Sequence, residues 1–391
     1  MPTRLQAAAA RAEAADRPRS ATSRSEALEA ATSLGVMTSD AASMDVLRTR
    51  VERALGAFVE RQLPASGDPD FQPLRTAAED LLAGGKRLRP AFCYWGWRGA
   101  GGADGPGIFT AAASLELLQA SALVHDDVMD KSDLRRGMPA AHRRFEALHE
   151  KEGWHGSAPQ FGEGAAILLG NLLLIWSGEM WRTSGLPRES LEAAQPVHDH
   201  MRTELMCGQY LDLLEQAHGE NTFDSALRVA LYKSGKYSVE QPLRLGLALA
   251  ARELAPWMDE LCTGYGRRVG IAFQLRDDIL GVFGDPAQTG KPAGDDLREG
   301  KRTMLVARTL AAASPGEAAT VRRLLGDPGL DEDGVTTLRG VIEGTGALSA
   351  CEDLIGDYLG EALDALGRAP VTEEARAALK DLAIAATSRT T

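Results

Sequence analysis

Three carboxylates with the spacing of a metal site, Asp126, Asp127 and Asp130, directly follow an apolar segment. In a helix, Asp126 and Asp130 are neighbours at i and i+4, and Asp127 lies beside them. Carboxylates this close repel one another unless a cation lies between them, and Mg²⁺ usually takes one or two carboxylates together with substrate phosphates. A solvated acidic helix end is the alternative, but the apolar approach over residues 120–124 favours the metal site.

A second acidic cluster lies much later in the chain, at Asp277 and Asp278, and it also ends an apolar segment. Gln274 shares their helical face, with the spacing i, i+3 and i+4. More carboxylates follow in a Gly-rich loop, at Asp285, Asp295 and Asp296. One acidic helix end is ordinary, but two, each preceded by a buried helix, predict a site where metal is held from two walls.

Basic residues provide the complement to these carboxylates. Lys86 and Arg89 lie three residues apart, and Arg135 and Arg136 closely follow the first acidic cluster. Lysines near the remaining motifs are Lys233, Lys236, Lys291 and Lys301. Arg binds phosphate oxygens in bidentate fashion, and Lys acts as a point charge. Any single pair is typical of a surface ion pair, but several sets beside two acidic clusters favour a ligand with two diphosphates.

The composition limits the class of protein. The chain has 391 residues, of which 44% are hydrophobic, so it can bury a large core and is not a disordered chain. Lys and Arg number 43 and Asp and Glu 55, giving a net charge of −12. This charge argues against nucleic-acid binding through a global positive field. The cysteines lie far apart and form no CxxC pair, as is typical of reduced thiols in a cytoplasmic protein.

No membrane or targeting segment is expected. The most apolar stretch, residues 165–176, is too short to span a bilayer and predicts a buried core helix. The start of the chain is Arg-rich, but its acidic residues argue against a transit peptide, and no signal peptide is evident. We therefore expect a cytoplasmic protein with no transmembrane segment.

Helical periodicity dominates after residue 43. Amphipathic segments cover residues 44–62, 72–83, 108–130, 162–183, 189–217, 223–251, 254–283, 300–313, 346–367 and 371–388. Short clusters of Gly, Pro and Asp separate them, and none looks like a long linker. The pattern predicts one large all-α domain over residues 44–391, preceded by a mobile tail over residues 1–43 that is rich in Ala, Arg and Ser.

Taken together, these motifs resemble the trans-isoprenyl diphosphate synthase (polyprenyl synthetase) family, over roughly residues 48–388. The matching runs, in the family's order, are GGKRLRP at 84–90, HDDVMD at 125–130, DLRRGMPAAH at 133–142, MRTELMCGQYLDLL at 201–214, YKSGKYSVEQPL at 232–243, FQLRDDILGVFGD at 273–285 and GKPAGDDLREGKRT at 290–303. The style is nearest the bacterial geranylgeranyl-type synthases. The resemblance implies a helical bundle with a central active-site cavity, and a homodimer.

The resemblance also implies a role for each matching residue. Mg²⁺ on the allylic diphosphate would be held by Asp126, Asp127 and Asp130, and from the opposite wall by Asp277 and Asp278. Isopentenyl diphosphate would be bound by Lys86, Arg89 and Arg136, together with the residue at Gln119. The allylic diphosphate would be bound by Arg135, Lys233 and Lys291, with Lys301 assisting. Lys233, Ser234 and Gln274 would lie near the allylic carbocation.

Four positions depart from the family pattern. Many members have His where Gln119 stands, and Thr where Ser234 stands. The second motif is commonly DDxxD, but its last position here is Gly281, so one carboxylate is missing unless Asp285 or another group supplies it. Asn171 stands where an Asp is expected.

The reaction that the resemblance implies is Mg²⁺-dependent head-to-tail (1′-4) condensation of isopentenyl diphosphate with dimethylallyl, geranyl or farnesyl diphosphate. Ser121 and Ala122 lie about one helical turn, roughly 5–7 Å, before Asp126. Both are small, so the cavity floor is predicted to be open past the farnesyl stage, with Leu118 one turn deeper as a stop. We therefore predict geranylgeranyl diphosphate (C20). Farnesyl diphosphate and longer C25–C35 products stay open.

Two rival interpretations remain. A class I terpene cyclase would share the all-α fold and a first DDxxD, but it would lack GGKRLRP and would usually carry an NSE-type second motif. A non-catalytic subunit of a heteromeric synthase would typically lose one Asp-rich motif. The absence of an Asp at Gly281 slightly favours the non-catalytic subunit, but both Asp pairs are present.

Overall fold

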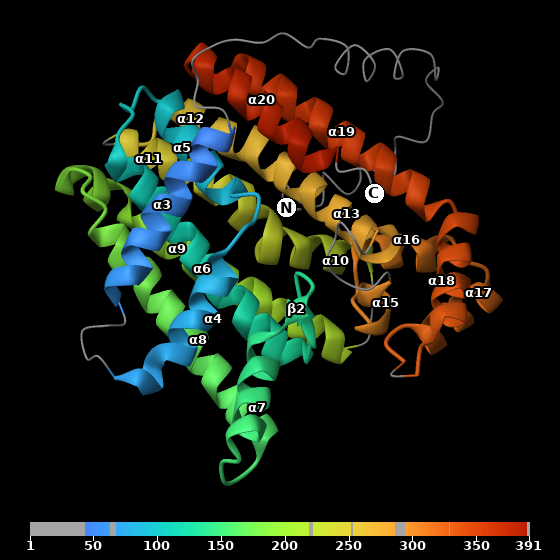
Figure 1. The fold of residues 1–391 in the computed structure, drawn as a ribbon. Coiled ribbons are helices and arrows are strands. Elements are labelled where there is room, and N and C mark those ends of the chain that lie inside the picture. Colours follow the sequence, from blue (N-terminus) through green and yellow to red (C-terminus); the bar gives the residue numbers. More distant parts are fainter. Residues whose placement is uncertain are drawn as a thin grey trace. The chain divides into compact units, whose positions relative to one another are not determined.

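The computed structural model describes residues 44–62, 68–218, 222–251, 253–285, 294–327 and 329–388. The expected tail over residues 1–43 and the predicted ligand Lys291 lie outside these described residues. The regular secondary structure of the described residues is helical apart from one short antiparallel hairpin, β1 (Leu134–Arg135) and β2 (Met138–Pro139). The predicted all-α fold is therefore confirmed (Figure 1).

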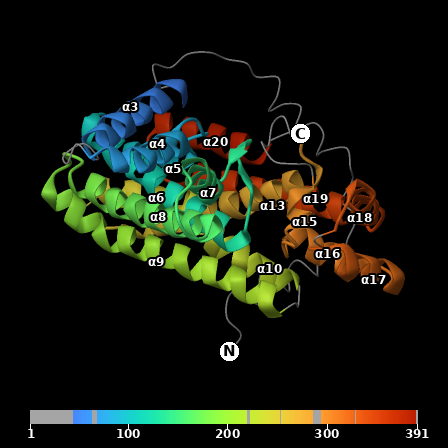
Figure 2. The ribbon, with the colours of Figure 1, turned by 60° about the horizontal axis from the view of Figure 1, so that its bottom comes forward.

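The helices fall into two sets along the chain. The first set is α3 (Met44–Gln62), η1 (Pro69–Phe71), α4 (Gln72–Leu82), α5 (Leu88–Gly99), α6 (Pro106–Asp130), α7 (Ala141–Glu152), α8 (Ala158–Arg182) and α9 (Arg188–His218). The second set is α10 (Phe223–Val229), η2 (Ala230–Glu240), α11 (Gln241–Ala250), α12 (Pro256–Leu261), η3 (Cys262–Gly266), α13 (Arg267–Phe283), α15 (Asp295–Arg298), α16 (Met304–Ala312), α17 (Pro315–Leu324), α18 (Glu332–Gly344), α19 (Ala347–Arg368) and α20 (Glu373–Thr387). In Figure 2, α6 and α8 run together on one side, and α13 continues toward α15 and α19.

Helix α6 is a core helix that carries the first acidic cluster at its C-terminal end. Leu115, Leu117 and Leu118 are completely buried, and the helix packs against α3, α5 and α8. Proline in the first turn suits its start, because that position needs no N–H donor. The helix ends at Lys131, whose φ of 55° is left-handed. Its carboxylates therefore lie at the negative end of the helix dipole, an unfavourable place unless cations surround them.

Helix α8 differs from the buried helix that the sequence predicts. It runs for 25 residues and buries only one side, with Leu169 and Leu173 inside and Leu168 and Ile175 on an outer side that is mostly exposed. Among the described residues, α6 and α8 are long and apolar enough to cross a membrane by length and composition. The most apolar window of α6 is 72% buried inside the protein, whereas that of α8 is only 39% buried. The expectation of a fully buried segment over 165–176 is therefore wrong for the outer face of α8.

A π-helical segment, η2, lies between α9 and α13 and brings lysines to the interior. Two glycines allow this approach. A Cβ atom at Gly208 of α9 would lie 2.4 Å from the backbone nitrogen of Lys233. One at Gly270 of α13 would lie 2.2 Å from the backbone oxygen of Gly235. A wider π turn changes which residues face each side, and such turns are frequent at functional sites.

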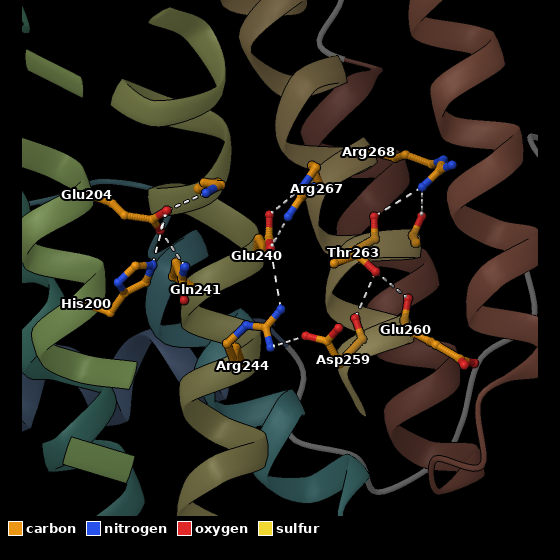
Figure 3. A network of polar contacts seen from close by, with 12 residues as sticks. His200, Glu204, Glu240, Gln241, Arg244, Asp259, Glu260, Thr263, Arg267 and Arg268 are labelled. Carbon is orange, nitrogen blue, oxygen red and sulfur yellow. Dashed lines mark hydrogen bonds and ion pairs between the residues drawn. The ribbon is translucent and has the colours of Figure 1, made fainter. Parts of the chain in front are cut away.

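A network of ion pairs fixes the second half of η2 (Figure 3). Glu240, only 2% exposed, accepts hydrogen bonds from Arg267 at 2.8 and 2.9 Å. Glu204 of α9 accepts from Gln241 at 2.6 Å and from Lys236. Because buried carboxylates are costly unless paired, these contacts hold η2 in one position against α9 and α13.

Candidate active site

A cavity of about 1030 Å³ lies between α6, α9, η2 and α13. It brings together side chains that are far apart in the sequence. The predicted site residues that line it are Lys86, Arg89, Gln119, Ala122, Asp126, Arg135, Arg136, Lys233, Ser234, Gln274, Asp277, Asp278 and Lys301. The two acidic clusters thus lie on walls of one cavity, as the sequence predicts, and basic side chains share that cavity.

Asp126 is the carboxylate of the first wall that lines the cavity. It accepts a hydrogen bond from the ammonium of Lys233 at 2.9 Å and another from the amide of Gln209. Lys233 also donates to Asp212 of α9 at 2.6 Å. Burial opposes ionisation, but the charges of Lys233, Lys301 and Arg135 lower the pKa of Asp126. Burial lowers the pKa of Lys233, but the charges of Asp126 and Asp212 raise it above its ordinary value. The ion pair between Lys233 and Asp126 is therefore charged.

Asp127 pairs with Arg135 inside the protein. Its side chain is 1% exposed, and it accepts hydrogen bonds from both Nε, at 2.9 Å, and Nη2 of Arg135, which itself lines the cavity. Asp127 therefore orients Arg135. Like Asp130, it is not among the described residues that line the cavity, and its role as a metal ligand stays a prediction. Burial and the charge of Asp126 raise the pKa of Asp130 to about 6.

Asp278 of the second wall is bound by neutral groups. Its carboxylate accepts from the Gln274 amide at 2.8 Å and from the Met304 backbone N–H at 3.2 Å, and it is 3% exposed. Burial, together with the charge of Asp296, raises the pKa of Asp278 to about 8 despite the hydrogen bond from Gln274. This wall therefore favours a proton or another cation at Asp278.

The segment around α15 adds a second set of charges to this wall. Lys301 forms ion pairs with Asp296 at 3.1 Å and with Glu299 at 2.5 Å. Glu299 in turn accepts from the hydroxyl of Ser132, which follows α6. This chain of contacts joins the ends of the two acidic walls.

The basic residues near α5 lie at another part of the cavity. Arg89 donates to Ser238 at 2.7 Å and stacks over Tyr237, with 4.7 Å between the guanidinium carbon and the ring centroid. Arg136 donates to the Ala83 carbonyl at 3.3 Å. Gly85, at a φ of 100°, lets this loop pass close to the Arg136 guanidinium. The cations Lys86, Arg89 and Arg136 thus line this part of the cavity.

Of the three residues expected to set chain length, Ala122 alone is among the described residues that line the cavity. Ser121 and Leu118 are completely buried. Ser121 precedes His125 by one turn and so shares its face, which packs on Gly170 of α8. The roles predicted for Ser121, Ala122 and Leu118 in chain length stay predictions, and the geometry favours Ala122.

Similarity to known proteins shows the family of this chain. The family model described as polyprenyl synthetase matches residues 71–340. This chain belongs to that family. It is 33% identical over 299 residues to the geranylfarnesyl diphosphate synthase of Aeropyrum pernix, covering 75% of this chain and 86% of that protein. It is also 33% identical over 332 residues to heptaprenyl diphosphate synthase component 2 of Geobacillus stearothermophilus, covering 84% and 93%.

A solved structure agrees with this membership. The geranylgeranyl pyrophosphate synthase of Corynebacterium glutamicum, complexed with isoprenyl diphosphate and magnesium, has a TM-score of 0.84 and 37% identity. The match covers 90% of this chain and all of that one. The protein is therefore a polyprenyl diphosphate synthase, a transferase of prenyl groups. The named relatives make products of different length, so membership alone leaves the product open.

Several polar residues of the cavity received no role from the sequence, among them Gln209, Asp212 and Asp296. Gln209 and Asp212 lie in α9 and contact Asp126 and Lys233. Asp296 lies in α15 and contacts Lys301. A polar pair at i and i+3 in the otherwise apolar run 205–214 is the signal that points to Gln209 and Asp212. For Asp296 the signal is weaker, because it lies in a loop with several acidic residues.

Proposed function

We propose that this synthase condenses isopentenyl diphosphate with allylic diphosphates and gives mainly geranylgeranyl diphosphate. One observation carries the proposal: a single large cavity has carboxylates on two walls and cationic side chains between and beside them. Substrates with two diphosphates and a long apolar chain match this lining, because the cavity also exposes Leu205 and Phe273.

The carboxylates fit Mg²⁺ as a ligand shared with substrate. Among the described residues, no three acidic, His or Cys side chains converge closely enough to hold an ion alone. Mg²⁺ is usually held by one or two carboxylates plus phosphate oxygens, so this arrangement suits it. Asp130 Oδ2 is buried and has no hydrogen-bond partner among the described residues, as expected of an atom that awaits a cation. We assign Asp126, Asp127 and Asp130 to one wall, and Asp277 and Asp278 to the other.

Bound Mg²⁺ would neutralise the allylic diphosphate and make it a better leaving group. The side chains of this chain hold and orient the reactants. Isopentenyl diphosphate would be bound by Lys86, Arg89, Arg136 and Gln119. The allylic diphosphate would be bound by Arg135, Lys233, Lys291 and Lys301. Holding both substrates in register removes much of the entropic barrier, up to about 7–11 kcal/mol for ideal alignment.

Gln274 and Ser234 would stabilise the allylic carbocation. The amide nitrogen of Gln274 donates to Asp278, so its carbonyl oxygen is directed to the other side of the side chain. Both residues line the cavity, where an oriented dipole stabilises positive charge better than water does. The double bond of isopentenyl diphosphate then attacks, and the released pyrophosphate takes the proton. No protein general base is required.

The test is to incubate purified protein with isopentenyl diphosphate, Mg²⁺ and, separately, C5, C10 and C15 allylic primers. Products are dephosphorylated and sized by chromatography. A C20 alcohol from all three primers is the expected result. A C15 or a C30 or longer alcohol would keep the enzyme class and overturn the chain length. No product from folded protein would favour the role of a non-catalytic subunit, which the match to a component of a heptaprenyl synthase makes the second candidate.

We also propose a homodimer in the cytoplasm. The exposed apolar side chains gather on α8 and α9, where Leu168, Ile175 and Tyr210 are each about 65% exposed. Burying such residues against a second copy would remove apolar surface from water. The four cysteines are all free, which suits a reducing compartment. Light scattering of the purified protein, with Ile175→Glu as the variant expected to dissociate it, tests the dimer.

A further inference from the structure

The last position of the second acidic motif, Gly281, has its place filled by a residue from another segment. In α13, Gly281 lies three and four residues after Asp278 and Asp277, and so on the face that lines the cavity. A Cβ atom built at Gly281 would lie 1.8 Å from Asp296 Oδ2 and 2.4 Å from its Cγ. These distances are far below van der Waals contact. The carboxylate of Asp296 therefore occupies the volume that a side chain at position 281 would take.

The position of Asp296 is fixed by its surroundings. It belongs to α15, where the neighbouring Leu297 is 1% exposed and anchors the turn in the core. The Asp296 carbonyl accepts from the Lys301 backbone N–H at 2.9 Å, and its side chain pairs with the Lys301 ammonium. An ion pair from Arg298 to Glu332 ties α15 to α18. Asp296 also lines the cavity together with Asp277 and Asp278.

We propose that Asp296 supplies the third carboxylate of the second metal wall, in place of the acidic side chain that α13 lacks at Gly281. This inference rests on the proposed function. Glycine at position 281 is then required, because any side chain there would displace the Asp296 carboxylate. The acidic motif is in effect divided between two segments, α13 and α15, and the second wall keeps three carboxylates.

The test measures Mg²⁺-dependent binding of inorganic pyrophosphate to the purified full-length protein by calorimetry. Asp296→Asn should raise the Mg²⁺ concentration for half-maximal pyrophosphate binding about tenfold, the scale of losing a supporting metal contact. Gly281→Asp alone should have a similar effect, because the two carboxylates cannot share one space. The double variant Gly281→Asp/Asp296→Gly moves the carboxylate back to α13 and should recover Mg²⁺ dependence to within about threefold of the original.

Two control variants separate the proposal from its rivals. Glu299→Gln removes the other carboxylate that holds Lys301, so it should alter turnover without changing the Mg²⁺ requirement. An equal change in Glu299→Gln and Asp296→Asn would show that the effect passes through Lys301 and would overturn the inference. Asp285→Asn tests the nearby loop carboxylate. A shifted Mg²⁺ requirement in this variant, with none in Asp296→Asn, would assign the missing ligand to Asp285.

The outcomes also separate this inference from the proposed function. If the original protein forms no prenyl product and binds no pyrophosphate with Mg²⁺, the proposed function fails. If it forms product but Asp296→Asn keeps the original Mg²⁺ requirement, only the role of Asp296 fails. Circular dichroism melting verifies that each variant is folded, and Asp296→Asn, which changes one atom type, decides the matter if Gly281→Asp does not fold.

Discussion

The two acidic walls of the cavity are built alike in sequence and differently in space. Each places carboxylates in the C-terminal half of a helix, at the end of α6 and five and six residues before the end of α13. At the first wall, Lys233 and Arg135 directly contact Asp126 and Asp127, and the pKa of Asp126 is lowered. At the second wall, Asp278 accepts hydrogen bonds from two neutral donors, the Gln274 amide and the Met304 N–H, and burial raises its pKa to about 8.

The difference shows that residue type and helical position do not decide the charge of a carboxylate. The first wall carries its counter-charges on neighbouring elements, and they favour the charged form of Asp126, although burial and the charge of Asp126 raise the pKa of Asp130. At the second wall, the cation Lys301 pairs with Asp296, which lies in another segment. A divalent cation that binds Asp278 would have to displace the proton that burial favours there.

The largest effect is expected from Asp126→Ala. This change removes a proposed metal ligand and leaves Lys233 without one of its two carboxylate partners. Turnover should fall by about 10³-fold or more, with the helical content unchanged. Product assays and far-ultraviolet circular dichroism check both parts. Normal product formation by this variant would remove the first wall from the chemistry.

Lys233→Met should break the charge balance that distinguishes the first wall. Asp126 and Asp212 would then face each other without the ammonium between them, and the pKa of Asp126 should rise. We expect a loss of about 100-fold in kcat/KM, because a phosphate contact and a counter-charge disappear together. Steady-state kinetics at varied allylic substrate measure it. A loss confined to KM for isopentenyl diphosphate would place Lys233 at the other substrate.

Ala122→Phe tests the depth of the cavity along the first wall. Ala122 lines the cavity, so a phenyl ring there should block the chain and shift the product to C15 or shorter. Ser121→Phe is the matched control. Ser121 is completely buried on another face of α6, so overpacking should cost about 1–3 kcal/mol of stability without shortening the product. Chromatography of the dephosphorylated products decides; a shorter product from Ser121→Phe alone would reverse the assignment.

The smallest effect on catalysis is expected at His198, which lies on α9 but outside the described lining of the cavity. Its ring stacks on Trp181 with centroids 4.5 Å apart, and burial, with Arg202 nearby, lowers its pKa to about 4. The unfolded state, with an ordinary pKa of about 6.5, binds more protons between these values. Stability should therefore fall as pH drops from about 6.5 to about 4, by about 3 kcal/mol in total.

His198→Phe keeps an aromatic ring against Trp181 but removes the titration. Urea unfolding of the two proteins between pH 4 and pH 7.5 should show a difference that changes only within that window. Turnover at neutral pH should stay within about twofold, since both acidic walls are untouched. An unchanged pH profile of unfolding in the variant would mean that His198 is not the group responsible.

Much of the fold was predictable because amphipathic periodicity marks helices that bury one face. The segment 44–62 coincides with α3, and 108–130, 189–217 and 346–367 match α6, α9 and α19 closely. Helix α5 was not predicted, because it has no polar face: its buried residues include Phe92, Cys93, Tyr94 and Trp95. Helix α7 was not predicted for the opposite reason, because its many charged residues leave only a narrow apolar stripe.

The sequence by itself determined the chemistry available to this protein: two acidic helix ends, a set of Arg and Lys residues, and the family that combines them. Only the tertiary structure decided that Asp127 binds Arg135, that Ala122 and not Ser121 reaches the cavity, and that Asp296 lies where Gly281 has no side chain. Spacing along a helix fixes which residues share a face. Which neighbour that face meets depends on packing between segments far apart in the chain, and no local pattern encodes it.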